Sequence, residues 1–309
     1  MPQLVKPRFA PALSNLPLSH QGKTRDTFEV PQHHKILAVV ATPRLSTHNV
    51  IHESVVPFKE EVLTALVVFW LTEVLQAAGI RHHLFAFGAK IFDHLPGRKA
   101  DYPEGSHYRT LLVKRLKMIP IEFIYRSYLM GTLYKLNQEG KDPYGLQLPD
   151  KLPLMTHFKS PLFTPTDKSE TDDPLDYRRV MNAEKKASEI SRKAYTIVSK
   201  YLKPKGIVLV DSKFELGEDD GGGIVLADEI ATPDSSRYCE ASQIVEGQQP
   251  DWLDKQVARN EAERIWKGTS GPPITFSPKV IEKLSITYLE IFHRITGMEL
   301  PQFQRTYLD

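Results

Sequence analysis

Short apolar or alternating runs predict several strands in the first part of the chain. Each run is bounded by polar residues and lacks helical spacing, as buried strands do. We expect these strands at residues 27–30, 35–41, 83–87 and 108–113, and from Pro120 to Ile124.

Three longer segments carry apolar side chains at helical spacing and predict helices. They are residues 59–78, with Gly79 as a cap, residues 175–202, and a last helix that begins at Pro278. Residues 140–173 are rich in proline, glycine, aspartate and lysine, which predicts a long and often functional loop. Strands followed by helices, with a hairpin between them, predict the α+β class rather than a doubly wound sheet.

The hairpin lies at residues 206–238 and carries the most specific chemistry. Two strand-like runs flank a turn of three acidic residues and three glycines, so we expect them to pair antiparallel. Side chains on a strand alternate between faces, which places Asp211, Lys213 and Glu215 on one face.

Two carboxylates of this hairpin are candidate metal ligands. A turn centred near residues 221 and 222 would put Glu215 opposite Asp228, where the two negative charges repel each other. Mg²⁺ would offset the repulsion, because it is held by one or two carboxylates together with phosphates and waters. Lys213 could meet a phosphate as a point charge. A solvated charged face is the simpler interpretation, and a slip of one residue in register would remove the pairing.

A second candidate element is the turn that contains Gly22, Lys23 and Arg25. The glycine lets the backbone approach a phosphate closely, and the two basic side chains could neutralise it. The segment is not a Walker sequence, since it has a single glycine and no helix follows. A plain solvent turn is the alternative.

Arginines and hydroxyl groups form a third candidate set. Arg126 ends an apolar strand shortly before Thr132, and the run of Asp234, Ser235 and Arg237 follows the hairpin directly. The planar fork of arginine suits a phosphate monoester, so these residues suggest an anionic sugar-phosphate substrate. Taken singly, each arginine is more often part of a surface ion pair. The histidines lack the spacing of a zinc site.

Composition excludes several classes of protein and partner. The 309 residues are 41% hydrophobic and 25% charged, which is ordinary for a globular protein that folds without disulfides. A net charge of +2, without a basic block, gives no reason to expect nucleic-acid binding. The longest apolar stretch, residues 62–75, is too short and too polar to span a bilayer, and residues 1–18 lack the apolar run of a signal peptide. With a single cysteine, Cys239, these features favour a cytoplasmic protein.

Seven segments, in order and spanning nearly the whole chain, together resemble the SAICAR synthetase family (phosphoribosylaminoimidazole-succinocarboxamide synthetase). They are GKTRDTFEV (22–30), ATPRLSTHNV (41–50), IPIEFIYRSYLMGTLYK (119–135), PLFTPTDKSETDD (161–173), GIVLVDSKFELG (206–217), LADEIATPDSSRY (226–238) and LDKQVARN (253–260). The DSKFELG and DEIATPDSSRY segments are the most specific of them.

The resemblance implies a two-lobed α+β fold with antiparallel sheets and an ATP cleft between the lobes. We place an N-terminal lobe with the phosphate-covering loop at residues 1–118, and a larger lobe with the hairpin, the ribotide site and the C-terminal helices at residues 119–309. The implied reaction joins L-aspartate to the carboxylate of carboxyaminoimidazole ribotide through an acyl phosphate, with ATP and Mg²⁺, and needs no nucleophilic side chain. The oligomeric state does not follow from the sequence.

Site residues are also implied by the resemblance. Lys213, Glu215 and Asp228 would be catalytic, with Glu215 and Asp228 as the magnesium ligands. The nucleotide would be bound by Gly22, Lys23, Arg25, Glu122 and Lys213, and the ribotide by Arg126, Thr132, Asp234, Ser235 and Arg237. A loop that carries Thr166, Asp167 and Lys168 would be a mobile segment over the site.

The chain departs from the usual family pattern at a few positions. Pro43 stands where the family usually has aspartate, Glu60 where it usually has glycine, and residues 167–170 read Asp-Lys-Ser-Glu where Thr-Lys-Ala-Glu is common. Pro43 removes both a carboxylate and a backbone donor. An ATP-binding paralogue without activity and a small-molecule kinase on the same scaffold are therefore the alternative functions.

Overall fold

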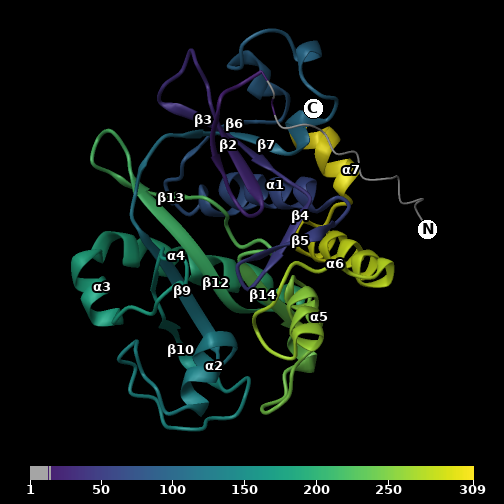
Figure 1. Cartoon of the computed structure of the whole chain (residues 1–309). Helices are drawn as coiled ribbons and strands as arrows, with labels where there is room; N and C mark the ends of the chain where they lie inside the picture. Colours follow the sequence, from purple (N-terminus) through teal and green to yellow (C-terminus); the bar gives the residue numbers. More distant parts are fainter. Residues whose placement is uncertain (1–12, 14) are drawn as a thin grey trace. The chain divides into compact units, whose positions relative to one another are not determined.

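The computed structural model describes residue 13 and residues 15–309, which form two compact units. The first unit takes the described residues up to Phe69, together with His83–Arg115 and Asp254–Asp309. The second unit takes Trp70–His82 and Leu116–Leu253. Figure 1 shows both and labels the larger helices and strands.

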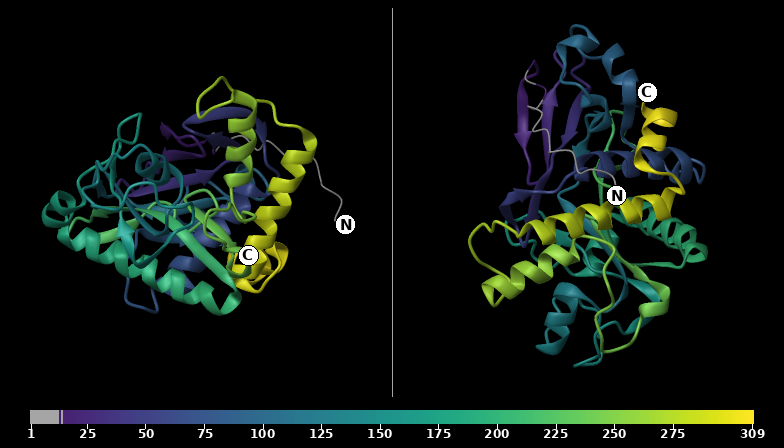
Figure 2. Two further views of the ribbon diagram at one scale, coloured as in Figure 1. Left: turned by 90° about the horizontal axis from the view of Figure 1, so that it is seen from below. Right: turned by 90° about the vertical axis from the view of Figure 1, so that its right-hand side faces the viewer.

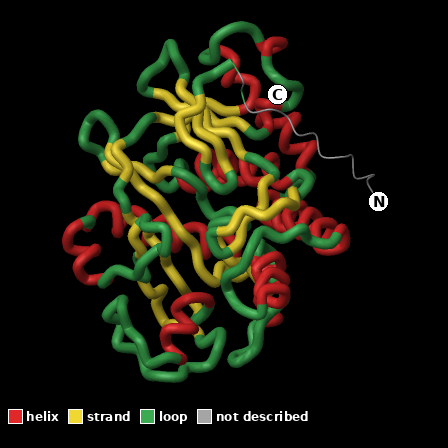
Figure 3. Tube along the Cα trace, viewed as in Figure 1, coloured by secondary structure: helices red, strands yellow, loops and turns green. Residues whose placement is uncertain are grey.

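The first unit contains a five-stranded antiparallel sheet, drawn in yellow in Figure 3. Its order is β1 (Leu18–Gln21), β2 (Arg25–Glu29), β3 (Ile36–Ala41), β7 (Thr110–Lys114) and β6 (Leu84–Phe87). Phe28 and Ala38 alternate with more exposed neighbours and, with Leu112, form part of the buried core of this unit. The strands expected from the apolar runs are therefore present, within a few residues at their ends.

A small hairpin and four helices complete the first unit. The hairpin pairs β4 (Arg44–Thr47) with β5 (Val50–Val55). The α-helices are α1 (Lys59–Phe69), α5 (Gln256–Trp266), α6 (Pro278–Thr296) and α7 (Leu300–Phe303). Shorter 3₁₀ and π-helical turns lie at Gly88–Asp93, Lys99–Asp101, Ser106–Tyr108 and Gln304–Leu308.

The grouping of the C-terminal helices differs from the expected division at residue 118. Helix α6 begins at Pro278 as expected, capped by Ser277, and packs against both α1 and α5 (Figures 1 and 2). The Ser285 hydroxyl donates to the carbonyl of Pro57 at 3.0 Å, so the end of the chain returns to the unit in which it begins. Residues 254–309 therefore belong to the first unit and not to the second.

The second unit is built on one long central strand, β12 (Ile207–Glu218). It pairs antiparallel with four other strands, which are β9 (Ile121–Tyr128), β14 (Ser236–Glu240), β13 (Ile224–Ala227) and β8 (Lys117–Met118). Two more strands, β10 (His157–Phe163) and β11 (Thr166–Asp167), pair with β9. Both lie inside residues 140–173, so the prediction of one continuous loop there was wrong. The two strands form because they pair with β9, and the local amino-acid composition does not indicate this pairing.

The helices of the second unit are α2 (Gly131–Gln138), α3 (Tyr177–Ala183) and α4 (Lys185–Leu202), with a 3₁₀ turn at Lys203–Lys205 and a 3₁₀ turn at Ala241–Gln243. Helix α4 packs against β12 (Figure 1). The prediction of one helix over residues 175–202 was wrong, because the backbone at Glu184 (φ −115°, ψ 47°) leaves the helical region.

The helix expected at residues 59–78 continues beyond α1 as a π-helical turn, Trp70–Leu75, and Gly79 follows in the left-handed conformation. In the described part of the chain, no helix has the length and apolar character needed to cross a membrane.

Candidate active site

Strand β12 carries two of the candidate residues of the second unit, Lys213 and Glu215, together with Asp211. In its ladder with β9, Asp211 lies opposite Arg126 and Lys213 lies opposite Ile124. The Lys213 ammonium donates to Oε1 of Glu215 at 3.3 Å, so these two side chains share a face as the alternation predicts. Lys213 and Glu215 are therefore fixed by a paired central strand rather than by a loop.

Lys213 sits between two carboxylates. Its Nζ donates to Oε1 of Glu122 at 2.6 Å as well as to Glu215, and 30% of its side chain is exposed. Burial by itself would lower the pKa of Lys213, but the carboxylates of Glu215, Glu122 and Asp228 outweigh it and raise the pKa. Lys213 is therefore a fixed positive charge at neutral pH.

Glu215 is buried, with 8% of its side chain exposed. Lys168, from the segment after β11, forms an ion pair with its second oxygen. Burial and the negative charge of Asp228 raise the pKa of Glu215, against the opposing effect of Lys213 and Lys168. Glu215 therefore interacts with a second carboxylate as well as with two lysines.

The expected pairing of Glu215 with Asp228 is off by one residue. Glu215 lies opposite Ala227, and Asp228 follows the end of β13 with a φ of 58°. A left-handed residue interrupts the regular alternation of a strand, so the face of Asp228 does not follow from the sequence pattern. The electrostatic interaction between the two carboxylates is nevertheless present.

The donor set formed by these two carboxylates fits Mg²⁺. Both offer hard oxygen ligands, and a cation would offset the repulsion that, together with the larger effect of burial, raises the pKa of Glu215. Over residues 13 and 15–309, no group of three or more histidine, cysteine, aspartate or glutamate side chains could hold a metal ion. Two carboxylates alone suit a cation that takes its other ligands from phosphates and waters.

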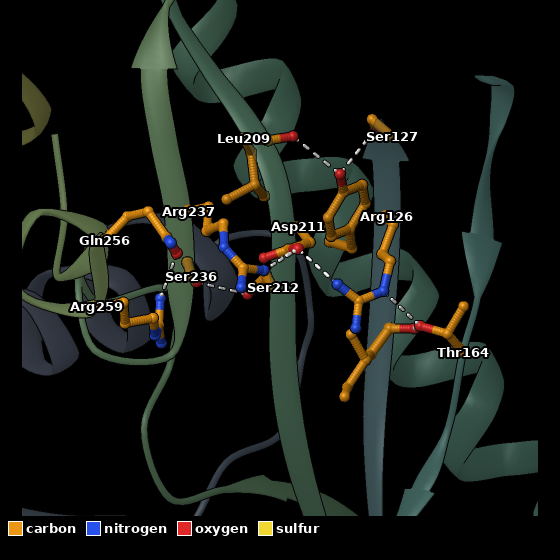
Figure 4. A network of polar contacts seen from close by, with 12 residues as sticks. Arg126, Ser127, Thr164, Leu209, Asp211, Ser212, Ser236, Arg237, Gln256 and Arg259 are labelled. Carbon is orange, nitrogen blue, oxygen red and sulfur yellow. Dashed lines mark hydrogen bonds and ion pairs between the residues drawn. The ribbon is translucent and has the colours of Figure 1, made fainter. Parts of the chain in front are cut away.

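Farther along β12, Asp211 joins two of the candidate arginines (Figure 4). Its Oδ2 accepts from Nη1 of Arg126 at 2.7 Å and from Nη1 of Arg237 at 2.5 Å. Arg126 also donates from Nε to the Thr164 hydroxyl at 2.9 Å. Arg126 and Asp211 are both buried, so their positions are defined by these bonds rather than by solvent.

Arg237 also lies against the start of α2. Gly131, the first residue of that helix, has a φ of 63°, and a Cβ there would lie 2.8 Å from Nη2 of Arg237. Only glycine adopts this positive φ without strain and, because it has no Cβ, leaves room for the Arg237 guanidinium. Thr132 follows in the first turn of α2 and is exposed.

Asp234 and Ser235 lie in the turn between β13 and β14. The Ser235 amide donates to the carbonyl of Thr232 at 3.2 Å, and the Thr232 amide donates back to the Ser235 hydroxyl at 3.2 Å. The Asp234 side chain is buried. This turn leads directly into β14, which carries Arg237.

The remaining candidates, Gly22, Lys23 and Arg25, belong to the first unit and form the turn from β1 to β2. The Gly22 amide donates to the carbonyl of Arg25 at 2.8 Å, and a Cβ on Gly22 would lie 2.8 Å from that same oxygen. The glycine is therefore required by the tightness of the turn. Lys23 donates from Nζ to Oδ1 of Asn49 at 2.7 Å.

Sequence reasoning missed several residues that the structure adds to these sets. Asp211 was placed on the correct face of the hairpin but given no role, and Lys168 was assigned to a mobile loop rather than to Glu215. Glu122, expected to bind the nucleotide, also contacts Lys213 and accepts from the Thr166 hydroxyl at 3.0 Å. The acidic side chains in the DSKFE segment are the signal that could have indicated Asp211.

Comparison with known proteins gives one consistent result. The family model for SAICAR synthetase matches residues 18–272. The phosphoribosylaminoimidazole-succinocarboxamide synthases of Desulfotalea psychrophila and Saccharomyces cerevisiae are 37% and 33% identical over 292 and 297 residues. Each alignment covers 91% of this chain, and 96% and 95% of the respective relative.

Solved structures agree. The SAICAR synthase of Saccharomyces cerevisiae, complexed with SAICAR, has a TM-score of 0.81 at 30% identity and covers 96% of this chain and 99% of its own. A SAICAR synthetase in complex with ADP has a TM-score of 0.65 at 26% identity, and the match covers 91% of this chain and 98% of that one. This chain belongs to the SAICAR synthetase family.

Proposed function

We propose that the protein is an ATP-dependent ligase that joins L-aspartate to the carboxylate of carboxyaminoimidazole ribotide, 5-amino-1-(5-phosphoribosyl)imidazole-4-carboxylate. The products are SAICAR, ADP and phosphate, as in de novo purine biosynthesis. The observation that carries the proposal is that Asp211 and Lys213 both lie on β12. Asp211 binds two arginines there, and Lys213 binds carboxylates two residues farther along. Relatives solved with SAICAR and with ADP support the same substrates.

The reaction needs two steps because a carboxylate has no good leaving group. A carboxylate oxygen of the ribotide attacks the γ-phosphorus of ATP, which forms an acyl phosphate and releases ADP. The amine of aspartate then attacks the acyl carbon, phosphate leaves, and the nitrogen loses a proton to give the amide. Transfer of this kind depends mainly on positioning and on stabilisation of the charge on the phosphoryl group.

Lys213 would supply positive charge to the transferring phosphoryl group. The carboxylates around it raise its pKa, so it stays protonated and acts as a cation rather than as a base. Glu122, at 2.6 Å from its Nζ, holds the ammonium in place. In the first unit, Gly22, Lys23 and Arg25 would cover the phosphates.

Glu215 and Asp228 would hold Mg²⁺, which when bound neutralises negative charge on the phosphates. Lys168, which pairs with Glu215 in this structure, is then close enough to contribute a second positive charge. The two carboxylates come from β12, which carries Glu215, and from Asp228, the residue that follows β13.

The ribotide would be held by the set formed by Arg126, Thr132, Asp234, Ser235 and Arg237. Arg126 and Arg237 are oriented by one oxygen of Asp211, so two planar donors are presented together for an anionic group.

The lone cysteine is buried and suits the reducing cytoplasm in which we place the protein.

Release of ADP from ATP and Mg²⁺ tests the proposal, measured with carboxyaminoimidazole ribotide in the presence and absence of aspartate. The proposal predicts ADP release that depends on aspartate, together with a succinocarboxamide product. Phosphorylation of the ribotide with no use of aspartate would instead identify a kinase. Binding of ATP without any turnover would identify a paralogue that has lost activity.

A further inference from the structure

The carbonyl groups of the turn at residues 22–25 are held by side chains from the start of the β4–β5 hairpin. Nη2 of Arg44 donates to the carbonyl of Gly22 at 2.8 Å, and Nε of Arg44 donates to that of Lys23 at 3.4 Å. The same guanidinium binds both oxygens of Asp26 on β2, at 3.1 and 2.6 Å. Arg44 therefore ties two successive peptide groups of the turn to a buried carboxylate.

Thr42 holds the next peptide group of the turn. Its amide donates to the carbonyl of Thr24 at 2.9 Å, and its hydroxyl donates to the same oxygen at 2.8 Å. The carbonyl of Arg25 accepts from the Gly22 amide within the turn itself. All four carbonyl oxygens of residues 22–25 thus have a donor supplied by the protein.

This arrangement fixes the direction of the amide groups. In a trans peptide the carbonyl of one residue and the amide of the next point in opposite directions. Because the carbonyls of Gly22 and Lys23 point toward Arg44, the amides of Lys23 and Thr24 point away from it. A phosphate is attracted to amides of this kind and repelled by carbonyl oxygens, so the order of the peptide planes decides whether the turn can bind an anion.

Pro43 lies between the two donor residues and strengthens the arrangement. Its carbonyl accepts from the Val56 amide at 3.1 Å, and Arg44 pairs with Val55 in the hairpin ladder. The ring fixes φ and leaves the segment fewer unfolded conformations to lose. A proline at this position is therefore compatible with a working turn, although the family usually has aspartate there.

We propose that Thr42 and Arg44 are positioning residues for the triphosphate of the nucleotide. They form a carbonyl clamp, which holds the carbonyls of the turn away from the phosphates and presents its amides and Lys23 to them. Lys23 is kept nearby by its bond to Asn49 and is exposed. The inference rests on the proposed function, since it requires that this turn meets ATP.

The test is the affinity of the full chain for ATP and Mg²⁺, measured by titration calorimetry beside the affinity for the ribotide. Arg44→Gln should weaken ATP binding about tenfold, the effect of losing one charge-assisted hydrogen bond. Its ribotide affinity should stay unchanged. Amide hydrogen exchange at residues 22–25 should become faster in the same variant, because the carbonyls lose their donors.

Two further variants separate positioning from stability and from charge. Arg44→Gln leaves the Asp26 carboxylate buried without its cation, so the double variant Arg44→Gln/Asp26→Asn removes that problem and should still bind ATP weakly. Arg115→Gln is the matched control: Arg115 also binds a carboxylate and a carbonyl, those of Glu29 and His34. It makes the same change of charge at the other end of β2 and should leave ATP affinity unchanged.

Wild-type ATP affinity in the folded double variant would overturn the carbonyl clamp while leaving the proposed ligase intact. An equal loss of ATP affinity in Arg115→Gln would also overturn it, because the effect would then come from net charge alone. A wild-type chain that binds no ATP would refute the proposed function and the clamp together.

Discussion

Replacement of Asp211 should destabilise the second unit. One oxygen of this buried side chain accepts from Arg126 and Arg237, at 2.7 and 2.5 Å. Asp211→Asn keeps the shape but removes the negative charge that Arg126 and Arg237 share. Breaking a buried ion pair by removal of one partner costs about 3–5 kcal/mol. Because asparagine can still accept one bond, we expect the lower end, about 3 kcal/mol.

Urea unfolding measures this loss, with Glu139→Gln as the control. Glu139 pairs with Lys141 at 2.7 Å in the same unit, but both side chains are more than half exposed, so its replacement should cost at most ~1 kcal/mol. A variant as stable as the control would refute the view that Asp211 organises the two arginines.

Three further changes test other parts of the account. Glu215→Gln or Asp228→Asn should abolish ADP release while the circular dichroism spectrum stays that of the wild type; full activity in either would remove the metal assignment. Burial raises the pKa of Glu60, and among the described residues its Oε2 has no hydrogen-bond partner. The stability that the protonated side chain gives is therefore complete below pH 4.5. It is lost as the pH rises through the folded pKa of Glu60, because the buried carboxyl group must then ionise. Glu60→Gln should therefore be more stable than the wild type in urea at pH 8, by about 1 kcal/mol, with little difference near pH 4; equal stability at both pH values would contradict this. Gly131→Ala should lower ribotide affinity and cost about 1–3 kcal/mol, since it adds a Cβ 2.8 Å from Nη2 of Arg237 at a positive φ; unchanged ribotide titrations would argue against that contact.

Much of the fold could be predicted from local patterns, because strands and capped helices are specified by nearby residues. The apolar run that became β3 and the Ser277–Pro278 start of α6 are examples. The return of residues 254–309 to the first unit depends instead on contacts between α6 and α1, which are far apart in sequence. The strands β10 and β11 exist because β9 offers them a partner, and a composition rich in turn residues hides this.

The candidate site shows the same limit. The alternation along β12 was enough to place Lys213 and Glu215 on one face, and the family motifs supplied the remaining roles. The position of Asp228 could not be predicted, since its left-handed backbone interrupts the alternation. The contact of Lys168 with Glu215 was missed for a different reason: it joins two segments whose approach depends on tertiary structure.

The most direct test of the central claim is release of ADP from ATP and Mg²⁺ by the wild-type chain, with carboxyaminoimidazole ribotide and with or without aspartate. We expect that aspartate is required for sustained ADP release and that one succinocarboxamide product forms for each ADP. Aspartate-independent turnover, or ATP binding with no turnover under any combination of substrates, would contradict it.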